Sequence, residues 1–396
     1  MPRTRKRKLV VAGLFVAGLL LLVATFAAFA TVDAWRDFGH KATDARRERI
    51  LHSPQWHDGH FINPQPLAND AWASVVGMCH ISEDVSPKQP VPVVRVDPSQ
   101  FQSLPPTGLR VTWMGHSSVL IEIDGYRVLT DPMWGPRASP LGWVGPKRWY
   151  DPRIALQQLP SIDAVLISHD HYDHLDYATI KAMKDWNTKF IVPLGVGAHL
   201  EYWGVAAAKI IELDWWDHTE IGSLQVHCTP ARHASGRTVV SDKDATLWAG
   251  YAVATAKHRV YFSGDTGLFP AMRDIGTRLG PFDLTMIETG QYNRAWPDWH
   301  IGPEQAVLAH QLVQGRVMLP IHWGLFALAF HGWTEPVERV LVAAQNSRVT
   351  LLLPKPGQSV EPQSAPPAIR WWPQVPWQTA HEHPIVSTQL GALSAP

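Results

Sequence analysis

The pattern of apolar and polar positions divides the chain into four parts. An apolar run, interrupted only by Gly and Thr, extends from residue 9 to the end of segment 1–32. Residues 33–106 have weak periodicity and end in a proline-rich stretch, which is typical of an extended segment lying over a surface. Residues 107–357 alternate strand and helix patterns, and residues 358–396 are rich in Pro, Ser and Ala, which indicates a peripheral or disordered tail. We therefore expect one folded domain over residues 107–357.

The start of this expected domain has the alternation of a β-hairpin. In "RVTWMGHSSVLIEIDGYRVLTDP" (residues 110–132) apolar-rich stretches are separated by turn residues, and Asp124-Gly125 has the composition of a tight hairpin turn. Further on, strand patterns precede helix patterns, as in "DAVLIS" followed by "DYATIKAMKDW" and "RVYFSGD" followed by "PAMRDIGTRL". This mixture predicts the α/β class, with sheets packed on each other and helices outside.

The apolar run at the N-terminus has the features of a membrane segment. It follows a cluster of basic residues between Arg3 and Lys8 and is longer than the ~20 residues that span a bilayer. A cleaved signal peptide has a shorter apolar region and a small-x-small site, which residues 28–30 (Ala-Phe-Ala) would provide. The length favours an uncleaved signal anchor. The positive flank then predicts that the rest of the chain lies on the non-cytoplasmic side, periplasmic or extracellular.

Composition narrows the function in two ways. Lys plus Arg and Asp plus Glu both number 35, so no charge bias points to a nucleic-acid partner. The two cysteines, Cys79 and Cys228, form no Cys-x-x-Cys pair, which excludes a cysteine-based zinc site. A single disulfide between them is compatible with an oxidising compartment, and the sequence leaves the pairing and the oligomeric state undetermined.

A cluster of metal-type side chains follows one buried strand pattern. The stretch "AVLISHDHYDHLDY" (residues 164–177) contains five such side chains directly after an apolar run: His169, Asp170, His171, Asp173 and His174. Stability alone does not explain this ending, because the side chains are polar and titrate. Imidazole and carboxylate groups are common zinc ligands. One loop cannot complete a metal site, so we expect further ligands elsewhere.

Three other predicted strands end near a histidine or an aspartate. "LQVHCTPARHASGR" ends in a loop at His233, "HRVYFSGDTG" ends at Asp265, and "VMLPIHWG" ends at His322. The glycines beside Asp265 let the backbone approach another segment closely. With the first loop, these ends supply seven ligands that we expect to meet at one sheet edge and to divide between two metal sites with open positions for water. The seven are His169, His171, Asp173, His174, His233, Asp265 and His322.

The remaining histidines of the strand and helix patterns are interpreted as structural. His199, His218 and His310 stand alone, and a lone histidine is more often a surface or satisfied core residue than a ligand. His381 and His383 lie in the proline-rich tail with no strand pattern before them, and we discount them as ligands.

At these residues the sequence resembles the metallo-β-lactamase fold superfamily, and within it the branch of phospholipases D that hydrolyse N-acyl-phosphatidylethanolamine. The resemblance covers roughly residues 107–357. The four-ligand loop resembles the superfamily as a whole, whereas "GPKR", "ELDWW" and "HWGLFALA" resemble the phospholipase branch and its bacterial relatives. The resemblance implies an αββα sandwich with a two-metal site between the sheets.

The resemblance also implies roles for individual residues. Two zinc ions, with iron or manganese as alternatives, would take three ligands each and share a bridging carboxylate, in this order: His169, His171 and His233; Asp173, His174 and His322; Asp265. Asp173 and Asp265 would act in catalysis, and His300 falls where the family has a histidine associated with the substrate. His116 and Asp131 fall in family motifs, with Asp131 supporting a ligand; ordinary turn and strand-end hydrogen bonding is an equal alternative for both.

These implications predict a dinuclear metal hydrolase that cleaves a phosphodiester, specifically an N-acyl-phosphatidylethanolamine-type phospholipid, to phosphatidic acid and an N-acylethanolamine. A phospholipid substrate agrees with membrane attachment through the N-terminal helix and with the 19 tryptophans. The aromatic residues expected near the site are Trp296, Trp299, Trp323, Phe326 and Phe330. The alternatives are a metal-dependent lactonase, another phosphodiesterase of this fold, and a non-catalytic membrane-tethered metal-binding protein. Seven ligands disfavour the last, because a structural zinc site is normally closed by four.

Overall fold

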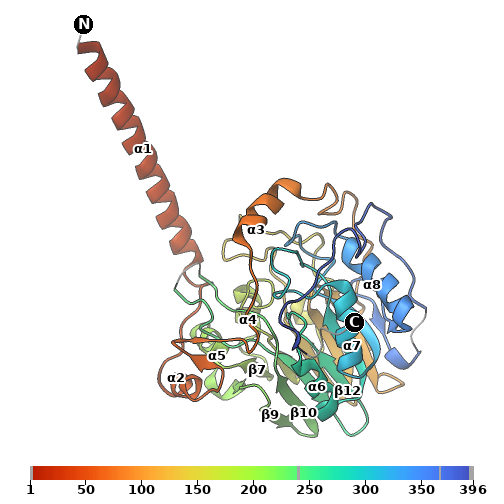
Figure 1. The fold of residues 1–396 in the computed structure, drawn as a ribbon. Helices are drawn as coiled ribbons and strands as arrows, with labels where there is room; N and C mark the ends of the chain where they lie inside the picture. The colour runs from red at the N-terminus through yellow and green to blue at the C-terminus, as the bar shows by residue number, and fades with distance from the viewer. Residues whose placement is uncertain (1–2, 239–240, 365–366, 392–396) are drawn as a thin grey trace.

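The computed structural model describes residues 3–238, 241–364 and 367–391. Helix α1 (Arg3–Ala34) projects from a rounded body formed by the rest of the chain (Figure 1). Among the described residues, α1 contains the one stretch that is long and apolar enough to cross a membrane, Gly13–Val32. An uncleaved anchor and a signal sequence share this property.

The first of two large sheets has the strand order β16-β3-β4-β5-β6-β7-β8. Its strands, in chain order, are β3 (Leu109–Gly115), β4 (Ser118–Ile123), β5 (Tyr126–Thr130), β6 (Ala164–Leu166), β7 (Lys189–Pro193), β8 (Ile210–Leu213) and β16 (Ser359–Val360). Strands β3, β4 and β5 are antiparallel, and Ile123 pairs with Tyr126 across the Asp124-Gly125 turn. The predicted hairpin is therefore confirmed.

The second large sheet has the strand order β15-β14-β13-β12-β11-β10-β9. Its strands are β9 (His218–Ile221), β10 (Leu224–Thr229), β11 (Gly250–Ala254), β12 (Arg259–Phe262), β13 (Phe282–Glu288), β14 (Gly315–Ile321) and β15 (Thr350–Leu351). Strands β12 to β15 run parallel, whereas β9 to β12 are antiparallel. Parallel neighbours need crossover connections, and helices supply them here.

The two sheets pack face to face around one large core. In β4, Val119 and Ile121 belong to the cluster that fills the space between the sheets, whereas Leu120 belongs to a second cluster on the outer face of the first sheet. This alternation follows from the period of two along a strand. All three side chains are fully buried, so the first sheet is covered on both faces.

Helices form the two outer layers. The helices of the body are α2 (Asp44–Leu51), α3 (Ala71–Gly77), α4 (Tyr177–Met183), α5 (Val196–Tyr202), α6 (Ala271–Leu279), α7 (Pro303–Leu312) and α8 (Glu335–Ser347). Side chains of α4 and α5 join the outer cluster of the first sheet, and those of α6, α7 and α8 pack against the second sheet. The result is the predicted αββα sandwich.

Residues 33–106 pack against the sandwich and carry short elements, including α2, α3 and a hairpin of β1 (Trp56–His57) and β2 (His60–Phe61). Ile50 and Phe61 from this segment are buried in the main core.

The chain beyond residue 357 is more ordered than its composition indicates. Strand β16 pairs with β3 and so belongs to the first sheet, while Trp372 and Leu390 are buried in the core. Prolines prevent regular secondary structure in this segment, but the apolar residues between them still pack. Of the two alternatives for this tail, peripheral or disordered, the disordered one is therefore corrected for residues 358–364 and 367–391. Both cysteines are free, Cys79 exposed and Cys228 buried, so the optional disulfide is absent.

Candidate metal centre

The predicted ligands come together from both sheets and not from one sheet edge. The loop after β6 of the first sheet carries residues 169–174, and loops after β10, β12 and β14 of the second sheet carry His233, Asp265 and His322. The expectation of a single edge is thus wrong in one respect. Two sheets that pack face to face bring their strand ends together, so a site between them draws on both.

One carboxylate of the loop after β6 attaches this loop to the segment between β10 and β11 of the second sheet. Asp170 is buried and accepts hydrogen bonds from the Gly236 amide at 2.8 Å and from the Thr246 hydroxyl at 2.9 Å. Its side chain also lies 3.3 Å from His199. Asp170 therefore anchors the loop, and the lone His199 is a satisfied core residue, as interpreted from the sequence.

Three histidines form the first part of the cluster. Nδ1 of His171 lies 2.9 Å from Nε2 of His169 and 3.2 Å from Nε2 of His233. Burial holds the pKa of each imidazole below its ordinary value, most strongly for His169 and His233. Three neutral ring nitrogens that point at one another offer lone pairs to a cation, because neutral imidazole is the form that binds metal.

The second part of the cluster surrounds two carboxylates. Oδ2 of Asp173 lies 3.3 Å from Nε2 of His174 and 3.4 Å from Nε2 of His322. Oδ2 of Asp265 lies 3.1 Å and 3.0 Å from the same two nitrogens, and 3.8 Å from Nε2 of His169. Asp265 therefore sits between the two parts, where a bridging ligand would lie.

The chemistry of these side chains fits bound cations. Oδ1 of Asp265 is buried without a hydrogen-bond partner, which is costly unless another group satisfies it. Burial opposes a positive charge on His174, yet its pKa lies well above the ordinary value because Asp265 and Asp173 are beside it. The same carboxylates raise the pKa of His322 against its burial. This concentrated negative charge would attract a cation in place of those protons.

Hydrogen bonds behind the ligands fix their ring orientations. Nδ1 of His174 lies 2.6 Å from Oδ2 of Asp131, which is fully buried and also accepts from the Ser168 amide. Nδ1 of His233 lies 2.8 Å from the carbonyl of Trp299. Such contacts leave Nε2 of each ring free to bind a metal. Asp131 thus occupies the supporting position that the resemblance implied.

Glu288 is a buried carboxylate at this centre that the sequence analysis missed. It ends β13, and its Oε2 lies 2.9 Å from Nδ1 of His300 and 3.3 Å from Nδ1 of His322. Its other oxygen accepts from the amide of Thr266. The signal was present, because "FDLTMIE" ends a buried strand in a carboxylate just as β14 ends beside His322.

His116 also contacts the cluster directly. Its Nε2 lies 2.9 Å from Oδ2 of Asp173, and its ring is tilted against the His322 ring, with 4.1 Å between the ring centroids. Burial and the neighbouring His322 lower its pKa to about 3. Both His116 and His322 have positive φ angles, 54° and 65°, a conformation that concentrates at functional sites.

The backbone of the loop after β12 closely approaches the loop after β6. Gly264, next to Asp265, has a φ of +58°, and a Cβ there would lie 2.7 Å from the side chain of Ser168. Ser168 immediately precedes His169 in the other sheet. The close approach predicted from the glycines beside Asp265 is therefore the contact between the two ligand-bearing loops.

A cavity of about 350 Å³ opens onto the cluster. Its lining combines four of the predicted ligands with polar and apolar side chains: His171, Asp173, Asp265, His322, His300, Asn69, Gln291, Trp296, Trp299 and Leu328. His300, the expected substrate-associated histidine, is among them. Of the expected aromatic residues, Trp296 and Trp299 line the cavity, whereas Trp323 and Phe326 are buried in the core.

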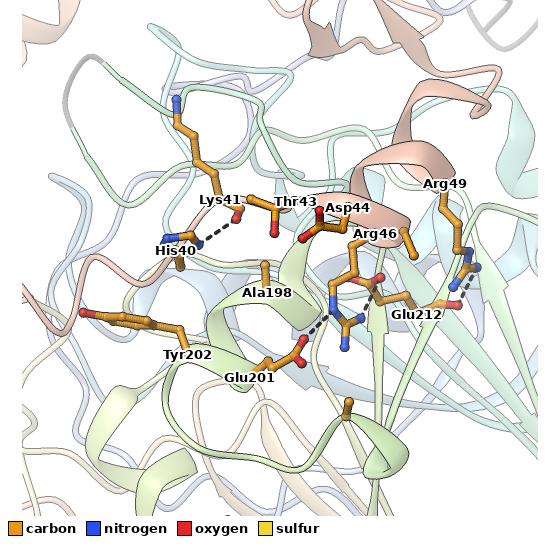
Figure 2. Close-up of a pocket in the computed structure, with 12 residues that line it drawn as sticks. His40, Lys41, Thr43, Asp44, Arg46, Arg49, Ala198, Glu201, Tyr202 and Glu212 are labelled. Atoms are coloured by element: carbon orange, nitrogen blue, oxygen red, sulfur yellow. Dashed lines mark hydrogen bonds and ion pairs between the residues drawn. The ribbon is translucent and has the colours of Figure 1, made fainter.

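A larger cavity, of about 600 Å³, lies elsewhere, between α2 and α5. Figure 2 shows Arg46 between Glu201 and Glu212, at 2.9 Å and 2.8 Å. Arg46 thus pairs with both carboxylates, and none of the seven predicted metal ligands lines this cavity. Among the described residues, the candidate metal groups likewise omit His381 and His383.

Comparison with known proteins defines the class. Residues 126–323, half of the chain, match the family described as "Beta-lactamase superfamily domain". A metallo-hydrolase structure from Ignicoccus hospitalis shares the fold, with a TM-score of 0.50 and 23% identity over 64% of this chain and 97% of that chain. The protein belongs to the metallo-β-lactamase superfamily and is a metal-dependent hydrolase of that fold.

Individual relatives indicate a branch within this superfamily. An uncharacterized protein of Mycobacterium tuberculosis is 46% identical over 330 residues, covering 81% of this chain and 87% of the relative. The N-acyl-phosphatidylethanolamine-hydrolyzing phospholipase D 1 of Caenorhabditis elegans is 38% identical over 257 residues, covering 62% of this chain and 70% of that enzyme. The resemblance to this phospholipase branch is thereby confirmed.

Proposed function

We propose that the protein is a dinuclear zinc hydrolase that cleaves N-acyl-phosphatidylethanolamine-type phospholipids to phosphatidic acid and N-acylethanolamine. The observation that carries the proposal is a single cavity lined both by four of the seven predicted ligands and by Trp296, Trp299 and Leu328. Such a lining suits a substrate with an anionic centre and an apolar body. The 38% identity with the worm phospholipase supports the same substrate.

The ligand set suits a phosphodiester, whose two free oxygens share a negative charge. When bound, two divalent cations lower the pKa of a water molecule and neutralise charge that grows on the phosphoryl oxygens. The chain's own contribution is to fix ligand orientations. Asp131, Glu288 and the Trp299 carbonyl hold the rings of three of the seven ligands, His174, His322 and His233. Preorganised groups cost no reorganisation when the reaction occurs.

His300 is placed to contact the substrate. Its Nδ1 lies 2.9 Å from Glu288, and its ring lines the cavity beside Asp265. Nε2 is therefore the nitrogen left for a substrate oxygen. We assign His300 to orient the leaving N-acylethanolamine, and to donate a proton to its oxygen as the bond to phosphorus breaks.

The proposal is tested by identifying products from defined lipids by mass spectrometry, in water enriched in oxygen-18. Attack at phosphorus puts the label into phosphatidic acid and leaves the N-acylethanolamine unlabelled. Labelled free fatty acid together with the deacylated phospholipid, and no phosphatidic acid, would instead indicate an acyl hydrolase. No turnover of any phospholipid, with rapid turnover of a lactone or a small soluble diester, would end the phospholipase proposal.

We also propose that α1 remains as an anchor and that the body lies on the non-cytoplasmic side. The support is the apolar stretch Gly13–Val32 and the basic residues that precede it in the sequence. Reporter domains active on one side of the membrane, fused after residue 60 and at the C-terminus, test the orientation. Activity of the cytoplasmic reporter at both positions would reverse it. N-terminal sequencing that starts at Thr31 would instead show a cleaved signal.

A further inference from the structure

Helix α3 and the turn after it present an apolar surface to solvent. Trp72 is 75% exposed, and its neighbours at helical spacing and in the following turn are exposed as well; together they form the α3 patch: Trp72, Val75, Val76, Met78 and Ile81. Residues 71–82 contain no Asp, Glu, Lys or Arg. Contiguous exposed apolar side chains without charges mark an interaction surface.

The α3 patch lies next to the wall of the metal-centre cavity. Asn69 lines the cavity, and the amide of the next residue, Asp70, donates to the Ala295 carbonyl at 2.7 Å. At the other end of α3, Gly77 packs so closely on the Phe330 ring that a Cβ would lie 2.5 Å from it. The Phe330 ring contacts the ring of Trp296, a cavity residue, at 5.3 Å.

A second apolar tip lies beside helix α1. Trp143 and Val144 are exposed at 45% and 44%, and the Trp143 ring lies 5.5 Å from the ring of Phe26 in α1. Both surfaces are held by the loop after β14. Near the tip, the Trp149 amide donates to the Leu325 carbonyl, and next to the α3 patch the Ser82 amide donates to the Phe330 carbonyl.

The contact between Trp143 and α1 indicates how deep the tip would lie in a bilayer. Phe26 lies six residues before Val32, the end of the membrane-length stretch, which is about 9 Å along a helix. A bilayer around α1 would therefore reach the tip at Trp143. Figure 1 shows α3 on the side of the body from which α1 projects. Tryptophan is enriched at the boundary between headgroups and acyl chains.

We propose that the α3 patch and the Trp143–Val144 tip dock onto the bilayer that holds α1, with their side chains at the headgroup–acyl boundary beside the cavity. A phospholipid then passes from the bilayer into the cavity without crossing bulk water. Continuity with α1 favours lipid over a second copy of the chain as the occupant. The inference rests on the proposed function in two respects: α1 remains as an anchor, and the substrate is a membrane lipid.

The chain offers a natural position for a probe. Cys79 is exposed in the turn that carries the α3 patch, whereas Cys228 is buried, so an environment-sensitive thiol probe labels the full chain at one site. After reconstitution into phosphatidylcholine–phosphatidylglycerol vesicles, we expect blue-shifted emission that lipid-borne spin labels quench and aqueous iodide does not. The control is Cys79→Ser with Lys257→Cys, because Lys257 is exposed in the turn before β12, at the end of the strand opposite Asp265. That probe should respond only to iodide.

Activity provides a second readout. Trp72→Asp combined with Val76→Asp should lower hydrolysis of vesicle phospholipid at least about tenfold while leaving hydrolysis of soluble bis(p-nitrophenyl) phosphate unchanged. Leu104→Asp is the matched control, because Leu104 is equally apolar and exposed but precedes β3 at the end opposite His116.

The outcomes separate docking from substrate. A Cys79 probe that stays in water overturns the docking proposal, even if vesicle phospholipid is hydrolysed. A probe shielded from both quenchers also overturns it, since protein would then cover the patch. A probe embedded in lipid without phospholipid hydrolysis supports docking and contradicts the proposed substrate.

Discussion

The two halves of the metal centre are built in different ways. One half is a single loop, residues 169–174, which follows β6 and carries four predicted ligands. The other half takes His233, Asp265 and His322 from loops after three strands, spread over residues 233–322. The loop half depends on local geometry, whereas the dispersed half depends on the register of a whole sheet. A site of this kind is therefore only as well ordered as the second sheet and its surroundings.

The residues that support the two halves also differ in how far away in the sequence their partners lie. Asp131 supports His174 from the position directly after the neighbouring strand β5, next to the hairpin that starts the domain. In the dispersed half, Asp298 binds Arg232 at 2.8 Å, the amide of Ala68 at 2.8 Å and the amide of Thr388 at 2.6 Å. Because Arg232 precedes His233, both terminal regions of the body contribute to the position of that ligand.

The largest loss of activity is expected from a substitution of Asp265, which contacts ligands of both halves. Asp265→Asn removes a negative charge that lies between the two groups of ligands, so we expect a loss in kcat/KM of roughly a thousandfold or more. Asp173→Asn, in the loop half, should have a loss of the same order. Steady-state kinetics with a soluble diester measure both. Near wild-type activity in either variant would remove that residue from the centre.

Asp298→Ala should destabilise the fold by about 3 kcal/mol, because it leaves the buried Arg232 guanidinium without its counter-charge. The measurement is chemical denaturation of the metal-loaded protein. Asp185→Ala is the matched control, since Asp185 pairs with Lys184 on the surface and should change stability little. Equal losses in the two variants would show that Asp298 does not hold the dispersed half together.

Glu288→Gln should reduce metal affinity or activity by about ten- to a hundredfold, because the amide no longer supplies a negative charge to His322 and His300. Competition with a chelator measures the affinity. His300→Ala is the comparison, and it should lower kcat while leaving the metal content unchanged. An unaltered metal affinity and activity in Glu288→Gln would assign Glu288 to packing alone.

A smaller effect is expected from pH. In the metal-free protein, Asp265 beside His174 and His322 holds both pKa values well above the ordinary value, so these protons stabilise the fold below about pH 6.5. That stabilisation is lost as the pH rises through the raised values. Bound metal replaces the protons, so the gap in Tm between metal-loaded and metal-free protein should widen as the pH rises above about 6.5. A constant or narrowing gap would contradict this account.

The same contrast explains how much the sequence could predict. The loop half stands out because its four ligands lie within six positions, and the hairpin at Asp124-Gly125 has strong turn chemistry. The dispersed ligands were recognisable at the ends of strand patterns, but their meeting between two sheets depends on packing that no local pattern contains. Glu288 was missed because a lone glutamate after an apolar run has many ordinary explanations. The order of the C-terminal segment was missed because composition does not show that Trp372 and Leu390 are buried.

The central claim is that the two halves form one centre for two cations. It is tested most directly by titrating the metal-free, full-length protein with zinc and counting bound metal by elemental analysis after removal of excess ion. The account predicts about two equivalents per chain in the wild type, with the second lost in Asp173→Asn. Saturation at one equivalent or less, with hydrolytic activity already complete, would contradict the dinuclear centre.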